Sequence, residues 1–434
     1  MNRLFRFLLL LVLALGGRGL AHPMPSSAVV LDVHDRAVRA ELQLPLSELG
    51  LALKQDLLGN PETVLAAHRA EFVHYLPQHV RPVSPDGRPW QVRVDELHVS
   101  QAEQTATGAY QELVATLTLT PPSGESTRVF TLNYDAVIHQ VVTHTALVSV
   151  RQDWASGVTP ETAPAQVGVI RTDPVTGTVA PLSVDRRSGS LWQGFVGMFR
   201  VGLTHIATGT DHLLFLLTLL LPAPLLVAAG RRQWGGFAGT HRALTTILKI
   251  VTAFTVGHSL TLILGTVLRV ETPPKPIEAL IALSILVSAV HALRPLFPGR
   301  EVLVAGGFGL VHGMAFSFTL AELKLSAGQM ALSLLGFNLG IEAMQLVVIA
   351  LTLPWLVLLA RTPVYAPVRV GGAVVAMLAS LGWLGQRLGL PNPLGTLADT
   401  LSPYGPWVIA ALALLALGVT AARRRRLPQA PTPG

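Results

Sequence analysis

Four histidines lie within strongly apolar stretches of the chain after about residue 190: His205, His212, His258 and His312. An ionisable side chain at the centre of a bilayer costs at least ~2.5 kcal/mol, so such residues usually face a partner, a cavity or an ion. The chain has no cysteine, which excludes thiolate ligands and a cysteine nucleophile. A metal ion would therefore be bound through nitrogen and oxygen, the ligand set that suits Ni²⁺, Co²⁺ or Zn²⁺.

The spacing of these residues suggests different roles for them. His205 and His212 are seven residues apart, which places them on nearly the same face of a regular helix. Asp211 flanks His212, where it could fix the tautomer of a ligand or accept a proton. Counting the helical rise puts His212, His258 and His312 near one depth. His205 is predicted about 10 Å further toward the outside, as a relay or entry ligand.

Further polar side chains accompany the histidines. Glu342 is the second carboxylate of the predicted site, and it shares one helical face with two amides. For any one histidine an ordinary interhelical hydrogen bond to Ser or Thr is the simpler explanation, whereas the whole set favours metal binding. The predicted supporting polar residues are Thr208, Thr255, Ser259, Asn338 and Gln345.

The composition defines the elements that must hold these residues. Half of the 434 residues are hydrophobic, 13% are charged and the mean hydropathy is +0.50, which excludes an ordinary soluble enzyme. The net charge of +7 forms no stripe of the kind that binds nucleic acid. We predict an all-α bundle of about seven transmembrane helices within residues 193–422. The predicted spans are 193–221, 243–268, 277–296, 302–322, 328–359, 367–386 and 405–422.

Charge also predicts how the bundle is oriented. Arginines follow the first, third, fifth and seventh predicted spans, and residues 423–434 form a basic tail that we place in the cytoplasm. At the other end, Arg3 and Arg6 precede an apolar run, and small residues end at Ala21, so residues 1–21 are predicted to be a signal peptide rather than an uncleaved anchor. The chain is thus predicted to be a multi-pass protein of the bacterial inner membrane with its N-terminal domain outside.

Residues 22–172 have alternating apolar and polar positions in several segments, which predicts a β-rich, sandwich-like extracytoplasmic domain. Residues 160–187 are rich in Pro, Thr, Gly and Ser, which predicts a linker. We place this linker between the two domains at residues 173–192.

Three histidines are weaker metal candidates within residues 22–172. Cleavage would leave His22 with a free amine that could help to chelate Cu(II) or Ni(II). His139 and His144 would lie on opposite faces of a regular strand, so surface decoration is preferred for them.

The membrane half resembles the HupE/UreJ family of hydrogenase and urease accessory membrane proteins. The resemblance covers about 193–422 and lies in four strings that contain His205 to Phe215, Phe254 to Leu262, Gly309 to Phe316 and Phe337 to Glu342. The string His22-Pro-Met-Pro resembles the subgroup with an extra N-terminal extracytoplasmic domain. The resemblance implies nickel or cobalt handling, with His205, Asp211, His212, His258 and His312 at the matching motif positions.

Three functions fit these residues. A metal permease or accessory transporter would bind the ion transiently near mid-membrane. A metal-dependent intramembrane hydrolase would keep the ion to activate water, with Asp211 or Glu342 as general base. A metal-sensing or assembly scaffold would dock a periplasmic or metalloenzyme-maturation partner. We favour the transporter over an enzyme, with a metal ion and the lipid bilayer as its partners, no nucleic acid, and a homo-oligomer permitted by Gly-rich spans.

Overall fold

The computed structural model describes residues 26–104, 108–228, 232–268, 273–323, 325–401 and 404–426. The predicted signal peptide and His22 lie outside these residues. The chain divides into two compact units. We call the first the sheet unit, with residues up to Asp153 and Ala163–Ser188, and the second the helical unit, with Trp154–Thr162 and the residues from Gly189 onward.

The sheet unit contains a six-stranded and a three-stranded sheet, in the orders β4-β5-β2-β1-β7-β8 and β3-β6-β9. All pairs are antiparallel except β1 with β7, which is parallel. Alternating side chains of β1 and β2 are buried, as the period-two pattern predicts. The strands are β1 Ser27–Val33, β2 Val38–Pro45, β3 Val80–Val83, β4 Gln91–Gln104, β5 Gly108–Thr120, β6 Val129–Tyr134, β7 Thr145–Asp153, β8 Ala165–Arg171 and β9 Leu182–Asp185.

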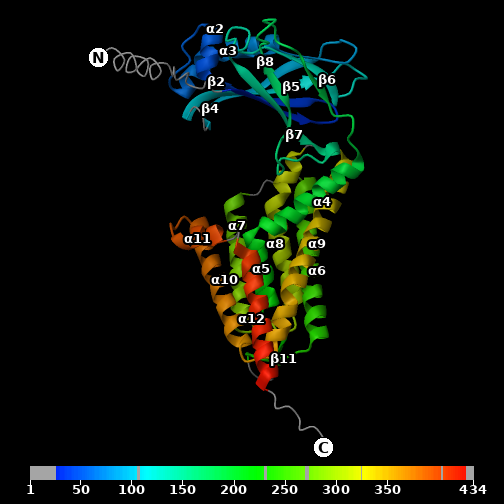
Figure 1. Ribbon diagram of the computed structural model, residues 1–434, viewed down its shortest axis with the longest axis vertical. Helices are drawn as coiled ribbons and strands as arrows, with labels where there is room; N and C mark the ends of the chain where they lie inside the picture. The colour runs from blue at the N-terminus through cyan, green and yellow to red at the C-terminus, as the bar shows by residue number, and fades with distance from the viewer. Residues whose placement is uncertain are drawn as a thin grey trace, which may run out of the picture. The chain divides into compact units, whose positions relative to one another are not determined.

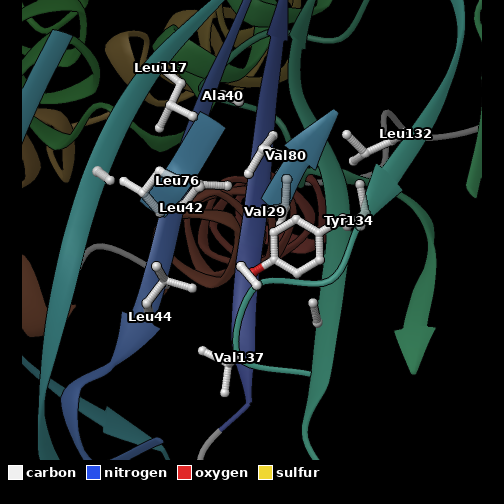
Figure 2. Packing of buried hydrophobic residues seen from close by; sticks show 14 of the residues in the cluster. Val29, Ala40, Leu42, Leu44, Leu76, Val80, Leu117, Leu132, Tyr134 and Val137 are labelled. Carbon is white, nitrogen blue, oxygen red and sulfur yellow. The ribbon is translucent and has the colours of Figure 1, made fainter. Parts of the chain in front are cut away.

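Helices α2 (Leu46–Leu53) and α3 (Pro61–His79) complete the sheet unit. The side chain of Asn60 caps α3 by accepting a hydrogen bond from the backbone of Glu62. One core joins both sheets and α3, since Leu42, Leu132 and Leu76 belong to the same buried cluster (Figure 2). The β-rich fold is therefore confirmed.

Residues 160–187 differ from the predicted linker. Two strands form there: β8 pairs with β7 and β9 pairs with β6. Both are short and stand between Pro- and Gly-rich turns, so their local composition resembles a linker. Their strand conformation depends on partners that lie elsewhere in the sequence.

The helical unit places a helix at each predicted span, and the helices run side by side in Figure 1. Its small elements are η1 Trp154–Ser156, β10 Leu225–Val227, β11 Trp234–Phe237 and α11 Pro393–Leu401. The larger helices are α4 Leu191–Thr208, α5 Thr210–Leu220, α6 Thr240–Leu268, α7 Pro274–Leu293, α8 Glu301–Glu322, α9 Ala327–Ala360, α10 Tyr365–Arg387 and α12 Gly405–Arg426.

Five of these helices, α6, α7, α9, α10 and α12, are long and apolar enough to cross a membrane. The bent pair α4 and α5 makes a sixth span if it is counted as one. The predicted fourth span corresponds to α8, whose apolar part Glu301–Ser317 is shorter than a full span among the described residues. The described helices thus give five or six candidate spans where about seven were predicted.

Two tightly packed helix pairs frame the interior of the helical unit. Helix α6 packs against α8, where a Cβ added to Gly257 would overlap the carbonyl oxygen of Gly306. Helix α4 packs against α9, where a Cβ on Gly202 would overlap the carbonyl oxygen of Phe337. Small residues let helix backbones approach this closely. This packing brings the histidine-bearing faces of several helices together.

Candidate metal site

The helix that carries the first two histidines is broken between them. Helix α4 ends at Thr208, α5 begins at Thr210, and the two are bent by 68°. Gly209 at the break has φ −72° and ψ 97°, and its N–H donates to the carbonyl of His205 at 3.0 Å. A Cβ at this position would lie 2.5 Å from that carbonyl oxygen and 3.1 Å from Nδ1 of His212. The break therefore needs a residue without a side chain.

The bend changes the predicted position of His205. Its ring centroid lies 4.7 Å from that of His212 and 6.4 Å from that of His258. The predicted offset of His205 by about 10 Å is wrong, because the helical rise applies only to an unbroken helix. The relay or entry role suggested for His205 stays a prediction. His205 belongs to the cluster itself.

Five side chains form two overlapping groups with the spacing of metal ligands. One group is His205, His212 and His258, and the other is Asp211, His212 and His312. Within each group the ligand atoms lie within 4.8 Å of one another. Tetrahedral ligands at ~2.0–2.1 Å from a metal are about 3.3 Å apart, so small side-chain adjustments would suffice to bind an ion. The ligands come from α4, α5, α6 and α8.

The imidazole nitrogens of this cluster are buried and mostly unpaired. His258 is 0% exposed and His312 is 1% exposed. Within the described residues no hydrogen-bond partner exists for Nε2 of His205, Nε2 of His212 or Nδ1 of His312, and neither ring nitrogen of His258 has a hydrogen bond of regular geometry. A buried polar atom without a partner costs ~1–3 kcal/mol, so several of them directed into one place indicate a ligand site.

Asp211 and Ser284 determine which nitrogens remain free. Oδ1 of Asp211 accepts a hydrogen bond from Nδ1 of His212 at 2.9 Å, which leaves the lone pair of this histidine on Nε2. The hydroxyl of Ser284 donates to the carbonyl of Ile281 at 2.7 Å, so its oxygen accepts from Nε2 of His312 at 2.9 Å. The lone pair of His312 is therefore on Nδ1. Both tautomers direct a free lone pair away from the orienting group.

The second predicted carboxylate lies outside the two ligand groups. Glu342 on α9 accepts a hydrogen bond from Thr252 on α6 at 3.4 Å through Oε1. Its Oε2 is buried without a partner among the described residues. Glu342 thus bonds α9 to α6, keeps one oxygen free and belongs to neither ligand group.

The predicted supporting residues mostly join helices. Thr255 donates to Gln345 at 3.0 Å, and Ser259 donates to Asn338 at 2.7 Å, so both pairs tie α6 to α9. Thr208 is exposed and donates to the carbonyl of Thr204 within α4, so the structure does not bring it to the cluster. Interhelical polar pairing, the alternative considered for the histidines, applies to these neighbours and, among the four histidines, to Nε2 of His312 through Ser284.

Sequence reasoning missed two parts of the site. Ser284 comes from α7, a span to which no site residue was assigned. Phe316 and Phe337 stack on each other with centroids 4.5 Å apart and lie 5.0 and 5.4 Å from the ring of His205. Phe337 directly precedes Asn338, and Phe316 lies four residues after His312, so proximity to the motifs was the available signal.

The weaker candidates of the sheet unit do not form a shared site. His139 stacks on His79 with centroids 4.2 Å apart and bonds to the carbonyl of Asp135. His144 is buried and pairs with Ser27 through Nε2 at 2.7 Å. Among the described residues the two metal-like groups are both in the helical unit.

These features define a multi-pass membrane protein with a cluster of histidines and one partly exposed carboxylate between its helices. Residues 182–387 match the family described as HupE / UreJ protein. The chain therefore carries a HupE/UreJ family domain over these residues, with an additional N-terminal region. The match extends from β9 to the end of α10 and includes every residue of the cluster. No curated protein and no solved structure gives a significant match.

Proposed function

We propose that the helical unit binds a divalent transition metal ion as cargo at this cluster and carries it across the membrane. The observation that supports this most directly is the convergence of His205, His212, His258 and His312 with unpaired ring nitrogens. Neutral imidazoles and a carboxylate are preferred by Ni²⁺, Co²⁺ and Zn²⁺. The resemblance to hydrogenase and urease accessory proteins and the matching family domain favour nickel or cobalt within this class.

The negative charge of the carboxylates suits a cation that is bound transiently. The Asp211 carboxylate offsets part of the ion's charge, which is costly in a low-dielectric interior. The side chain of Asp211 is 34% exposed, so the site is not fully enclosed. Glu342 on α9, with its free Oε2, supplies a second negative charge among the helices of the same unit.

The broken helix supports transport rather than permanent storage. Discontinuous membrane helices commonly form the substrate sites of transporters, where the ends of the half-helices face the ion. Here the C-terminal end of α4, which carries His205 in its last turn, faces the cluster. The negative end of that helix dipole favours a cation. A change in the bend at Gly209 would alter the access of a metal ion to His205 and His212 together.

Metal analysis tests this function. Full-length protein would be purified in detergent from cells grown with Ni²⁺, Co²⁺ and Zn²⁺ together, and its metal content measured by elemental mass spectrometry. We expect substoichiometric nickel or cobalt, lost in His212→Ala and retained in the control His139→Ala. Equal metal in wild type and His212→Ala would contradict the proposal. One zinc ion that survives dialysis against chelator would favour the intramembrane hydrolase instead.

We also propose the orientation given by the charges, with the sheet unit outside and the basic tail in the cytoplasm. The absence of cysteine makes labelling direct. In Val175→Cys, at a residue that is 91% exposed in the sheet unit, a membrane-impermeant maleimide should react in spheroplasts. In Leu296→Cys, after α7, labelling should require permeabilisation. The reversed pattern would overturn this orientation.

A further inference from the structure

A cavity of about 660 Å³ lies at one end of the helical unit, away from the histidine cluster. Its residues come from three segments: the approach to β11, the end of α7 and the first turns of α10. The volume is within the ~300–1,000 Å³ typical of ligand pockets. The lining residues are Arg232, Gln233, Trp234, Leu293, Arg294 and Arg369.

Side-chain contacts hold the walls of this pocket together. The indole N–H of Trp234 donates to the carbonyl of His291 at 3.0 Å, which fixes β11 to the end of α7. The ring of His291 stacks on Phe297 with centroids 3.9 Å apart and meets Trp234 edge-on. Arg369 reaches from α10 to donate to the carbonyls of Ala292 and Leu293. These contacts fix Trp234 and Arg369 in the wall of the pocket, while Arg232, Gln233 and Arg294 are exposed around it.

The charge of the pocket is unbalanced. Three guanidinium groups line it, and no carboxylate does. Within the described part of the chain, Arg232 and Arg294 form no ion pair, and Nε of Arg369 is buried without a hydrogen-bond partner. Like charges gathered in a partly enclosed site repel one another unless an anion is bound.

We propose that this pocket binds a phosphate-bearing anion, either the headgroup of an anionic phospholipid or free phosphate. The planar guanidinium presents paired donors that match phosphate oxygens, and Arg294 and Arg369 approach from different helices. Gln233 adds an amide that can bond a headgroup hydroxyl. Basic pockets between membrane helices are suited to phospholipid headgroups. Topology alone requires positive charge in these loops but does not require that it converge on one cavity.

Native mass spectrometry of the full-length protein tests whether the bound anion is a phospholipid headgroup. Protein would be extracted from vesicles of phosphatidylcholine with and without phosphatidylglycerol. We expect bound phosphatidylglycerol on the wild type, reduced about tenfold in Arg294→Gln and further in Arg294→Gln/Arg369→Gln, since each removes charged hydrogen bonds. The matched control is Arg300→Gln, which removes the same charge from an exposed residue outside the pocket.

Arg369 also contacts backbone carbonyls, so Arg232→Gln provides a second variant in case the double variant misfolds. Lipid-free protein in detergent would be titrated with inorganic phosphate while the fluorescence of the protein, including Trp234, is followed. Saturable phosphate binding that Arg294→Gln weakens, with no preference for phosphatidylglycerol, would assign the site to free phosphate. Equal lipid and phosphate binding by wild type, Arg294→Gln, Arg232→Gln and Arg300→Gln would overturn the proposal.

Discussion

The histidines of the sheet unit and those of the helical unit differ in how their nitrogens are paired. In the sheet unit Nδ1 of His79 donates to the carboxylate of Asp135 at 2.8 Å. His144 pairs with Ser27 through Nε2, and its Nδ1 has no hydrogen bond but lies 3.6 Å from a carboxylate oxygen of Glu48. In the helical unit most ring nitrogens of the cluster have no partner among the described residues. Burial is similar, since His144 is 2% exposed and His258 is 0% exposed.

The difference shows what an unpaired imidazole indicates. In the sheet unit, turns and strand ends offer carbonyls and side chains that can pair with histidine. In membrane helices the backbone groups already bond within the helix, so a buried imidazole must find a side chain, water or an ion. Four such imidazoles gathered without enough side-chain partners are better explained by a ligand than by packing.

The largest expected effect is on His258, the most deeply buried ligand of the cluster. In His258→Ala, metal affinity should fall by more than about a hundredfold, because loss of a ligand exceeds the 10–100-fold cost of losing an orienting group. Titration with Co²⁺, followed by its visible absorption, measures both affinity and coordination. His139→Ala should titrate like the wild type. If both variants behave alike, the contrast between the two units has no functional meaning.

Asp211→Asn should weaken metal binding about 10–100-fold. Asparagine loses the negative charge, and its amide N–H₂ can donate to His212, which would favour the tautomer with the wrong free nitrogen. The same Co²⁺ titration measures the affinity, and hydrogen exchange provides the control for folding. Retained wild-type affinity would mean that Asp211 neither orients His212 nor offsets the charge of the ion.

Acid should affect the sheet unit through His144. Burial lowers the pKa of His144 to about 4 from its usual value of 6.5, so the unfolded state binds a proton more readily. The contribution of neutral His144 to the free energy of unfolding should be fully present above about pH 6.5. It should decrease as the pH falls toward 4, by on the order of 2 kcal/mol. Burial raises the pKa of the neighbouring Glu48, which opposes this trend at the acidic end.

Hydrogen exchange of the β1 and β7 amides in the full-length protein, corrected for the intrinsic effect of pH, measures this loss. In His144→Asn the slope between about pH 6.5 and 4 should largely disappear. An unchanged slope would assign acid sensitivity to other groups in the sheet unit.

The smallest expected effect is on Ser284. In Ser284→Ala, Nε2 of His312 loses its acceptor while the lone pair on Nδ1 remains available, so metal affinity should fall by about tenfold or less. Isothermal titration with Ni²⁺ measures this change, and Ser288→Ala on the same helix is the matched control. A loss as large as that in His258→Ala would show that Ser284 does more than orient His312.

The sequence alone predicted the two-part organisation and most of the site. Alternating apolar and polar residues predicted β1, β2 and β5, because the side-chain period of a strand is independent of its partners. The regular helical rise placed His212, His258 and His312 near one depth. These are local properties of the chain, and local geometry was sufficient to predict them.

The tertiary structure decided the features that depend on partners or on a break in regularity. The bend at Gly209 moved His205 into the cluster, and the register of α7 brought Ser284 to His312. Strands β8 and β9 form only because β7 and β6 lie beside them. The arginine pocket joins three segments that are distant in sequence. Hydropathy and periodicity describe one segment at a time, whereas these features arise from contacts between segments.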